Sequence, residues 1–230
     1  MDILTFDVLD STNNYLKEFY QKMENLSVVV AKTQTKGRGR SDRTFLSNKG
    51  GAYFSILLKP PFNFAAHELT PLAAVAVKKG IKEATKIDTK IKWVNDLIYN
   101  DKKVCGILCE AISKQNKIEA IIIGIGININ RPKNGFEEFE DIATSLYKRG
   151  GKIRKIIEAV LDNFLEIYLN KEDFFDEYKD SLITIGKKVK IQKNNKVGKA
   201  IDLAKDFSLV VEYLDGEKER INVGEIVVKS

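Results

Sequence analysis

Between residues 90 and 127, apolar and polar side chains alternate, and this alternation constrains the fold more than any other feature of the sequence. A period of two is that of a β-strand, so we expect strands over residues 90–94, 97–99, 104–110 and 118–127. Asn100-Asp101-Lys102 and Lys114-Gln115-Asn116, which separate the later strands, are typical of tight hairpins. The sequence therefore predicts an antiparallel meander.

Strands and helices mix irregularly in the rest of the chain, which predicts the α+β class with a mixed or antiparallel sheet. Before the meander we expect strands at residues 6–9, 27–31 and 52–58, one helix from Thr12, and another that runs to Thr85 with Thr70 as cap. After it we expect helices over residues 153–169 and 174–182. Short strands from residue 185 to residue 229 predict a small SH3-like β-barrel. The predicted domains are residues 1–182 and 183–230.

The composition limits the partners and the chemistry. The net charge of +6 favours anionic partners, although 32 acidic residues are equally compatible with a mixed, solvated surface. No apolar run reaches the roughly 18 residues that span a bilayer, and the first residues are acidic, so we expect a cytoplasmic protein without a membrane partner. Cys105, Cys109 and His67 are too few for a zinc site, and we expect two reduced packing cysteines and a surface histidine.

The connection between the strands at 27–31 and 52–58 has the composition of a binding loop. It contains Gly37 and Gly39 and the cations Lys36, Arg38, Arg40 and Arg43. Glycine permits a close backbone approach, and guanidinium groups bind phosphate or carboxylate through paired hydrogen bonds. A connection of about twenty residues without periodicity is more often a binding loop or lid than a plain link. It predicts a site for an anionic small molecule or a nucleic-acid backbone, with a solvated surface loop as the ordinary alternative.

Lys92 begins a second functional element, because it is followed by Trp93, Asn95 and Asp96. A lysine on a strand ordinarily faces solvent and a tryptophan ordinarily belongs to the core, but the amide and carboxylate beside Lys92 favour a binding site. Further along, Gly124 and Gly126 leave shallow positions where a ligand can approach. The glycine patterns of P-loop and dinucleotide-binding folds are absent from the sequence.

Taken in order, six motifs resemble those of the biotin protein ligases, which are similar in fold to lipoate ligases. Each motif is weak alone, but their order and spacing from residue 11 to about residue 130 are specific, and the small C-terminal barrel also fits. The motifs are Ser11-Thr12-Asn13, Gln34 before Gly37-Arg38-Gly39-Arg40, Gly50-Gly51-x-Tyr53-x-Ser55, Lys92-Trp93-x-Asn95-Asp96-Leu97, Gly106-Ile107-Leu108-x-Glu110 and Gly124-x-Gly126-x-Asn128.

The resemblance implies a reaction in two steps that uses ATP, biotin and Mg²⁺. The biotin carboxylate attacks the α-phosphate of ATP, giving biotinyl-5′-AMP and pyrophosphate, and a lysine of a biotin carboxyl carrier domain then takes the acyl group. Cations are needed because two unit charges of like sign repel by about 4 kcal/mol at 4 Å and an effective dielectric constant near 20. The implied catalytic residues are Lys92, between carboxylate and α-phosphate, and Arg38.

The resemblance also implies two sets of ligand contacts. The biotin contacts would be Ser11, Thr12, Asn13, Gln34, Gly37, Arg38, Gly39, Arg40, Lys92, Gly106, Leu108, Gly124 and Gly126. The ATP and adenylate contacts would be Arg38, Arg40, Arg43, Phe45, Lys92, Asn95, Asn128 and Arg131. Three departures from the family pattern bear on how the loop closes: Val94 replaces proline, Ser41-Asp42 replaces Arg-Gly, and Phe45 replaces tryptophan.

Two other functions are compatible with the residues. Lipoate or octanoate ligation uses the same general fold. A basic nucleic-acid-binding protein would use the arginine loop and the barrel, although the barrel offers only Phe207 and Tyr213 for base stacking. Larger family members carry an N-terminal DNA-binding domain, and because the pattern here starts close to Met1 we expect no specific DNA binding. An exposed edge of the meander could pair two subunits into a homodimer.

Overall fold

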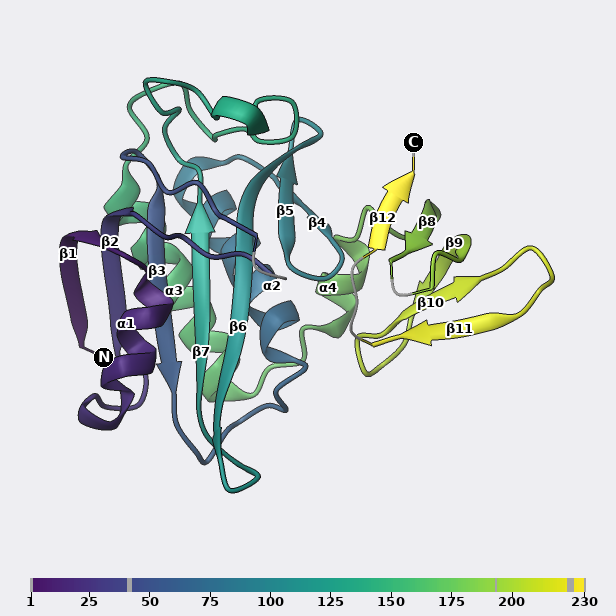
Figure 1. The fold of residues 1–230 in the computed structure, drawn as a ribbon, viewed down its shortest axis with the longest axis horizontal. Helices are drawn as coiled ribbons and strands as arrows, with labels where there is room; N and C mark the ends of the chain where they lie inside the picture. Colours follow the sequence, from purple (N-terminus) through teal and green to yellow (C-terminus); the bar gives the residue numbers. More distant parts are fainter. Residues whose placement is uncertain (1, 41–42, 193, 223–225, 230) are drawn as a thin grey trace.

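One large and one small β-sheet organise the chain (Figure 1). The structure is a computed structural model and describes residues 2–40, 43–192, 194–222 and 226–229. The large sheet has seven strands in the order β1-β2-β3-β7-β6-β5-β4, and the small sheet has five in the order β11-β10-β9-β8-β12. The strands are β1 (Ile3–Leu9), β2 (Val28–Gln34), β3 (Ala52–Leu58), β4 (Lys90–Lys92), β5 (Asp96–Tyr99), β6 (Lys102–Lys114), β7 (Lys117–Ile127), β8 (Lys188–Ile191), β9 (Val197–Leu203), β10 (Leu209–Glu212), β11 (Lys218–Ile221) and β12 (Ile226–Lys229).

Helices cover both faces of the large sheet (Figure 1). They are α1 (Thr12–Phe19), α2 (Leu69–Thr85), α3 (Ile153–Asn170) and α4 (Phe175–Asp180), with short 3-10 turns η1 (Tyr20–Lys22) and η2 (Glu137–Phe139). Within the described residues, no helix has both the length and the apolar character needed to cross a membrane.

The predicted meander is confirmed: β4, β5, β6 and β7 pair antiparallel with their neighbours along the chain. Asn100 and Asp101 have φ values of 49° and 60°, and Gln115 and Asn116 have values of 49° and 61°, as tight hairpins require. The strand expected over residues 90–94 is shorter, because β4 ends at Lys92 and Trp93 packs in the core with 4% of its surface exposed.

Two other expectations need correction. Helix α2 begins at Leu69 with Glu68 as its N-cap, rather than with Thr70 as cap. Strand β2 runs on to Gln34 because β1 pairs with it in parallel, so Gln34 belongs to a strand rather than to the loop.

The predicted fold class is confirmed: a large mixed sheet with helices is followed by a small C-terminal antiparallel sheet. The small sheet is not closed into a full barrel, with β11 and β12 at its edges among the described residues.

Side-chain alternation on β7 separates the core from the ligand-accessible face. Odd-numbered isoleucines from Ile121 to Ile127 pack in the main core with residues of α2 and α3. Ala120 and Ile122 point the other way, into a smaller cluster with Leu16 of α1. Gly124 and Gly126 continue this second face. The sheet therefore offers a shallow surface beside α1, at the place where the connection from β2 to β3 crosses in front of β6 and β7 (Figure 1).

Trp93 joins the large sheet to the small one. Its indole N–H donates to the Phe207 carbonyl over 3.0 Å, and its backbone N–H donates to Thr184 Oγ1 over 3.0 Å, both in buried surroundings. From α4, the Tyr178 hydroxyl donates to the Val94 carbonyl over 3.0 Å. The motif that carries Lys92 is thus held in place from the C-terminal side. As expected, Cys105 and Cys109 are free thiols and His67 is exposed.

Candidate functional site

One transverse row of the large sheet brings the sequence motifs together. Register aligns Tyr53 with Gly126, Gly126 with Gly106, Gly106 with Asp96 and Asp96 with Lys92. Residues paired directly across antiparallel strands place their side chains on the same face. In the next row, Ser55, Gly124 and Leu108 are aligned in the same way. The sheet therefore presents a hollow of glycines between an aromatic side and a charged side.

A cavity of about 50 Å³ lies over these glycines, and we call it the small cavity. Every predicted biotin contact lines it except Gly37 and Lys92: Ser11, Thr12, Asn13, Gln34, Arg38, Gly39, Arg40, Gly106, Leu108, Gly124 and Gly126. Gly37 lies directly behind its wall, because a Cβ atom built there would stand 2.3 Å from the Phe45 carbonyl oxygen. Sequence motifs that lie more than a hundred residues apart thus meet in one hollow.

A polar network fixes the groups at the α1 end of the small cavity. The Thr12 N–H donates to Gln34 Oε1 over 2.8 Å, and Gln34 Nε2 donates to Ser47 Oγ over 2.8 Å. The buried Ser55 hydroxyl lies 2.6 Å from both Thr12 Oγ1 and Asn13 Oδ1. Ser11, the N-cap residue of α1, makes no side-chain capping bond. This arrangement offers donors and acceptors in fixed positions to a small polar ring.

Glu110 carries the charge at this end of the site. It accepts from Lys17 Nζ over 2.7 Å and from Asn13 Nδ2 over 2.8 Å, and Arg38 Nη2 lies 3.4 Å away. Burial alone would raise the pKa of the Glu110 carboxyl, but the hydrogen bonds from Lys17 and Asn13 and the charges of Lys17 and Arg38 outweigh it and hold that pKa below its usual range. Ionised Glu110 therefore orients both Asn13 and Arg38. In the sequence, Glu110 belongs to one of the six motifs, but it was not predicted to take part in binding or catalysis.

Phe45 fills much of the hollow. A Cβ atom on Gly126 would lie 2.6 Å from a carbon of the Phe45 ring, and one on Gly106 would lie 3.1 Å from another. A side chain at Gly126 would collide with the ring, and one at Gly106 would crowd it. The Phe45 ring also meets the Tyr53 ring edge-on, with 6.3 Å between centroids. The small cavity is small because this ring rests on its floor.

A second cavity of about 700 Å³, the large cavity, adjoins the first. Its walls include the predicted nucleotide contacts Arg40, Arg43, Phe45, Lys92, Asn95 and Asn128. Ile226 and Val228 of β12 also line it, so it lies between the large sheet and the small one. Arg131 lines neither cavity: it pairs with Glu140 and lies 5.7 Å from the centre of the Phe136 ring.

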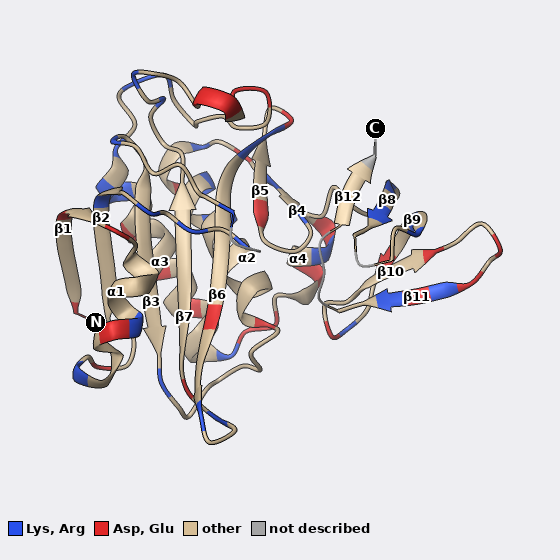
Figure 2. Cartoon of the chain, in the orientation of Figure 1, with Lys and Arg blue, Asp and Glu red and all other residues tan. Residues whose placement is uncertain are grey.

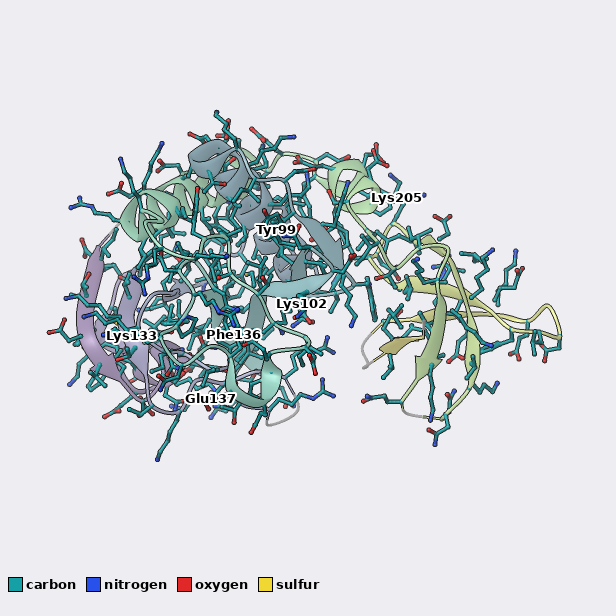
Figure 3. The ribbon with its side chains drawn as sticks, turned by 90° about the horizontal axis from the view of Figure 1, so that it is seen from above. Tyr99, Lys102, Lys133, Phe136, Glu137 and Lys205 are labelled. Atoms are coloured by element: carbon teal, nitrogen blue, oxygen red, sulfur yellow. The ribbon has the colours of Figure 1, made fainter. Side chains whose placement is uncertain are left out.

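Both basic and acidic residues line the large cavity. Figure 2 shows basic residues along the loop between β2 and β3, and acidic residues on η2. Glu138 and Asp141, on and after η2, line the large cavity. Figure 3, which labels Phe136 and Glu137, looks down on this segment beside Lys102. Lys102 helps to hold the η2 segment in place, because Lys102 Nζ donates to the Glu140 carbonyl over 2.8 Å.

Sequence reasoning missed Lys103, which lines both cavities, and four charged residues that line the large cavity, Asp101, Glu138, Asp141 and Lys187. It also did not assign Ser47 or Ser55 to ligand binding, although both belong to the polar network. Arg40, which was predicted, donates to Asn95 Oδ1 over 3.1 Å and thereby links the loop to the Lys92 motif. The departure at Ser41-Asp42 lies outside the described residues.

Comparison with known protein families matches both parts of the chain. Residues 5–128 match the family described as Biotin/lipoate A/B protein ligase family, and residues 184–229 match the Biotin protein ligase C terminal domain. The first match covers the strands and loops that form the small cavity. The second covers the five strands of the small sheet.

Similar proteins and structures carry ligase names. The chain is 43% identical over 154 residues to the bifunctional ligase/repressor BirA of Bacillus subtilis. The matched segment covers 65% of this chain and 47% of that protein. The chain is 32% identical over 123 residues to the biotin–[acetyl-CoA-carboxylase] ligase of Paracoccus denitrificans, covering 52% of this chain and 51% of that one. The chain thus spans about half the length of these curated relatives. The biotin protein ligase of Aquifex aeolicus, solved with biotin and ATP, superposes with a TM-score of 0.85 at 30% identity, over 99% of this chain and 98% of that one.

Proposed function

Because the chain belongs to the biotin/lipoate A/B protein ligase family, we propose that it is an ATP-dependent biotin protein ligase. The observation that carries the proposal is the junction of two cavities, one lined by the predicted biotin contacts and one by the predicted nucleotide contacts. The names of the relatives, and the complex of the Aquifex aeolicus ligase with biotin and ATP, support the same ligands.

In the first step the small cavity would hold biotin and the large cavity would hold ATP. The ureido ring would face the Thr12, Gln34 and Ser55 network, whose donors and acceptors are already oriented. The Phe45 side chain would move off Gly106 and Gly126 to admit the fused rings of biotin, and it would then close over the nucleotide. A carboxylate oxygen of biotin forms a bond to the α-phosphorus, and pyrophosphate leaves with the electron pair of the broken bond.

Cations make this attack of one anion on another feasible. Arg38 lines the small cavity, Lys92 lines the large cavity, and Arg40 lines both. Preorganised positive groups stabilise the charge that builds on the phosphoryl oxygens in the transition state. We propose that Mg²⁺ accompanies the ATP phosphates, whose oxygens are ligands that suit it; among the described residues, no three acidic, histidine or cysteine side chains gather closely enough to hold a metal ion.

In the second step an acceptor lysine amine would attack the acyl carbonyl of biotinyl-5′-AMP. The new amide forms as the bond from the acyl carbon to the phosphate oxygen breaks, AMP leaves, and the amine loses a proton. The acceptor we propose is a biotin carboxyl carrier domain of a biotin-dependent carboxylase, in line with the name of the Paracoccus denitrificans relative. Its lysine would enter through the large cavity.

Transfer to a carrier domain tests this function. The protein is incubated with ATP, Mg²⁺, biotin and a purified biotin carboxyl carrier domain, and the product is detected with avidin. We expect ATP-dependent labelling of the carrier and none of a carrier whose target lysine is replaced by arginine. ATP-dependent attachment of lipoate or octanoate to its own carrier domain, with no attachment of biotin, would contradict the proposal and favour the related ligase activity.

A further inference from the structure

Glu110 lies on β6 behind the small cavity and lines neither cavity itself. Register pairs it with Ile122, one row beyond the row of Leu108 and Gly124 at the edge of the hollow. Its carboxylate nevertheless contacts two residues of α1 and one residue of the loop between β2 and β3. A single side chain outside the small cavity thus connects the sheet, the helix and the loop that surround it.

The two oxygens of Glu110 have different partners. Oε2 accepts from Asn13 Nδ2 over 2.8 Å, whereas Oε1 accepts from Lys17 Nζ over 2.7 Å and lies 3.4 Å from Arg38 Nη2. A carboxylate only accepts hydrogen bonds, so it turns the Asn13 amide nitrogen toward itself and leaves Asn13 Oδ1 to accept from Ser55. Only 17% of the Glu110 side chain is exposed, so water screens these contacts less than it screens an ion pair on the open surface.

The Arg38 side chain ties the loop to the helix and the sheet at this point. Arg38 Nη1 donates to Asn14 Oδ1 over 3.2 Å, so the guanidinium group lies between α1 and Glu110. The Arg38 backbone bridges across the loop to the residue before Phe45, and the Phe45 N–H donates to the Gly37 carbonyl over 2.9 Å. The residue that pairs with Glu110 therefore belongs to the base of the loop that carries Phe45.

We infer that Glu110 is a positioning residue that holds this loop over the small cavity, an inference that rests on the function proposed above. Its ion pair with Arg38, which we call the latch, keeps the base of the loop against α1 and β6. With the latch closed, bound biotin has to pass the Phe45 ring to leave, whereas with the latch open the base of the loop can move away as well. Glu110 therefore sets how long biotin stays bound without touching it.

A direct contact between Arg38 and the biotin carboxylate makes the opposite prediction. In that case Glu110 competes with the ligand for the guanidinium group, and Glu110→Gln slows the release of biotin. If Glu110 forms the latch, Glu110→Gln speeds the release. The four proteins to compare are wild type, Glu110→Gln, Arg38→Met and the double variant. Because both single changes open the same latch, the double variant should release biotin no faster than the faster single variant.

The measurement is the dissociation rate constant of labelled biotin after an excess of unlabelled biotin is added. We expect Glu110→Gln to raise it about fivefold, as for loss of an ion pair with one partly exposed partner. The matched control is Glu119→Gln on β7, whose carboxylate accepts from the Tyr20 hydroxyl over 2.6 Å and lines neither cavity. This variant should release biotin at the wild-type rate. Unchanged or slower release from Glu110→Gln, or effects that multiply in the double variant, would overturn the inference.

Steady-state kinetics separate the latch from a general loss of structure and from the proposed function. In biotin-dependent exchange of pyrophosphate into ATP, Glu110→Gln should raise the KM for biotin about fivefold and leave kcat within about twofold of wild type, because Glu110 touches neither reactant. A lower kcat with an unchanged KM would indicate loss of folded enzyme and refute the latch. Absence of biotin binding to the wild type would instead refute the proposed function itself.

Discussion

The Phe45 ring lies on Gly126, so closely that a Cβ atom on that glycine would stand 2.6 Å from a ring carbon. The ring thus occupies the floor of the cavity to which we assign biotin. Phe45 also lines the large cavity, so one movement of this ring can both open the biotin site and cover the nucleotide.

Phe45→Ala should therefore have opposite effects on the two substrates. We expect the association rate of biotin to rise, because the site no longer waits for the ring to leave, and the affinity for ATP to fall about tenfold with the lost aromatic contact. Stopped-flow binding of biotin and calorimetric titration of ATP measure these effects. Leu46→Ala, at the next residue, which lines the large cavity only, is the control for biotin association. An unchanged association rate in Phe45→Ala would argue against the ring as a gate.

Glu110 should make the protein sensitive to acid. A carboxyl whose folded-state pKa is depressed contributes stability that is present above its ordinary pKa of about 4.5 and is lost as the pH falls through the lower folded value. The free energy of unfolding of Glu110→Gln at pH 7 should be about 1 kcal/mol lower than that of the wild type, because two charge-assisted hydrogen bonds weaken. As the pH falls below 4.5, Glu110→Gln should lose less further stability than the wild type does. Urea unfolding across this pH range tests both points.

The control for this experiment is Glu166→Gln on the exposed side of α3. A pH profile of Glu110→Gln that overlays that of the wild type would exclude Glu110 as a source of acid sensitivity.

Trp93→Phe should weaken the connection between the two sheets. The change keeps an aromatic ring but removes the donor to the buried Phe207 carbonyl, and an unsatisfied buried acceptor costs about 1–3 kcal/mol. Urea unfolding followed by circular dichroism measures the loss, with Tyr99→Phe, outside this contact, as control. A variant as stable as wild type would mean that the indole bond contributes nothing to the packing of the small sheet.

Lys92→Ala should slow adenylate formation about 10²-fold, because it removes one of the positive groups that line the large cavity, where we propose that the ATP phosphates bind. Single-turnover formation of biotinyl-5′-AMP measures this step without product release. Lys90→Ala on the same strand, which is exposed, is the matched control. Adenylate formation at the wild-type rate in Lys92→Ala would remove Lys92 from the first step.

Local sequence patterns predicted much of this structure. The features that could not be predicted depend on how distant strands pair in the sheet. The meander follows from alternation and hairpin residues within β4 to β7, and the glycine hollow follows from Gly124 and Gly126 on one face of β7. The reach of Lys103 to Asp96 was not predictable, because it depends on the pairing of Gly106 with Asp96 across two strands. Likewise, the parallel pairing of β1 with β2, which carries Gln34 into the sheet, has no local signal.

Arg131 shows the limit of a motif without its surroundings. The sequence suggested an anion contact, but Glu140, nine residues away in an irregular loop, holds the guanidinium apart from both cavities. Only the folded loop places these two side chains together. Charge type alone therefore does not place a residue at a cavity, whereas the predicted Lys92, Arg40 and Arg43 do line the large cavity.

The central claim is that a biotin site and an ATP site meet at one boundary and react there. Exchange of labelled pyrophosphate into ATP by the purified protein tests it most directly. We predict exchange that requires biotin and is not supported by lipoate or octanoate at the same concentration. Exchange supported by lipoate but not by biotin, or no exchange with any of these acids, would contradict the account.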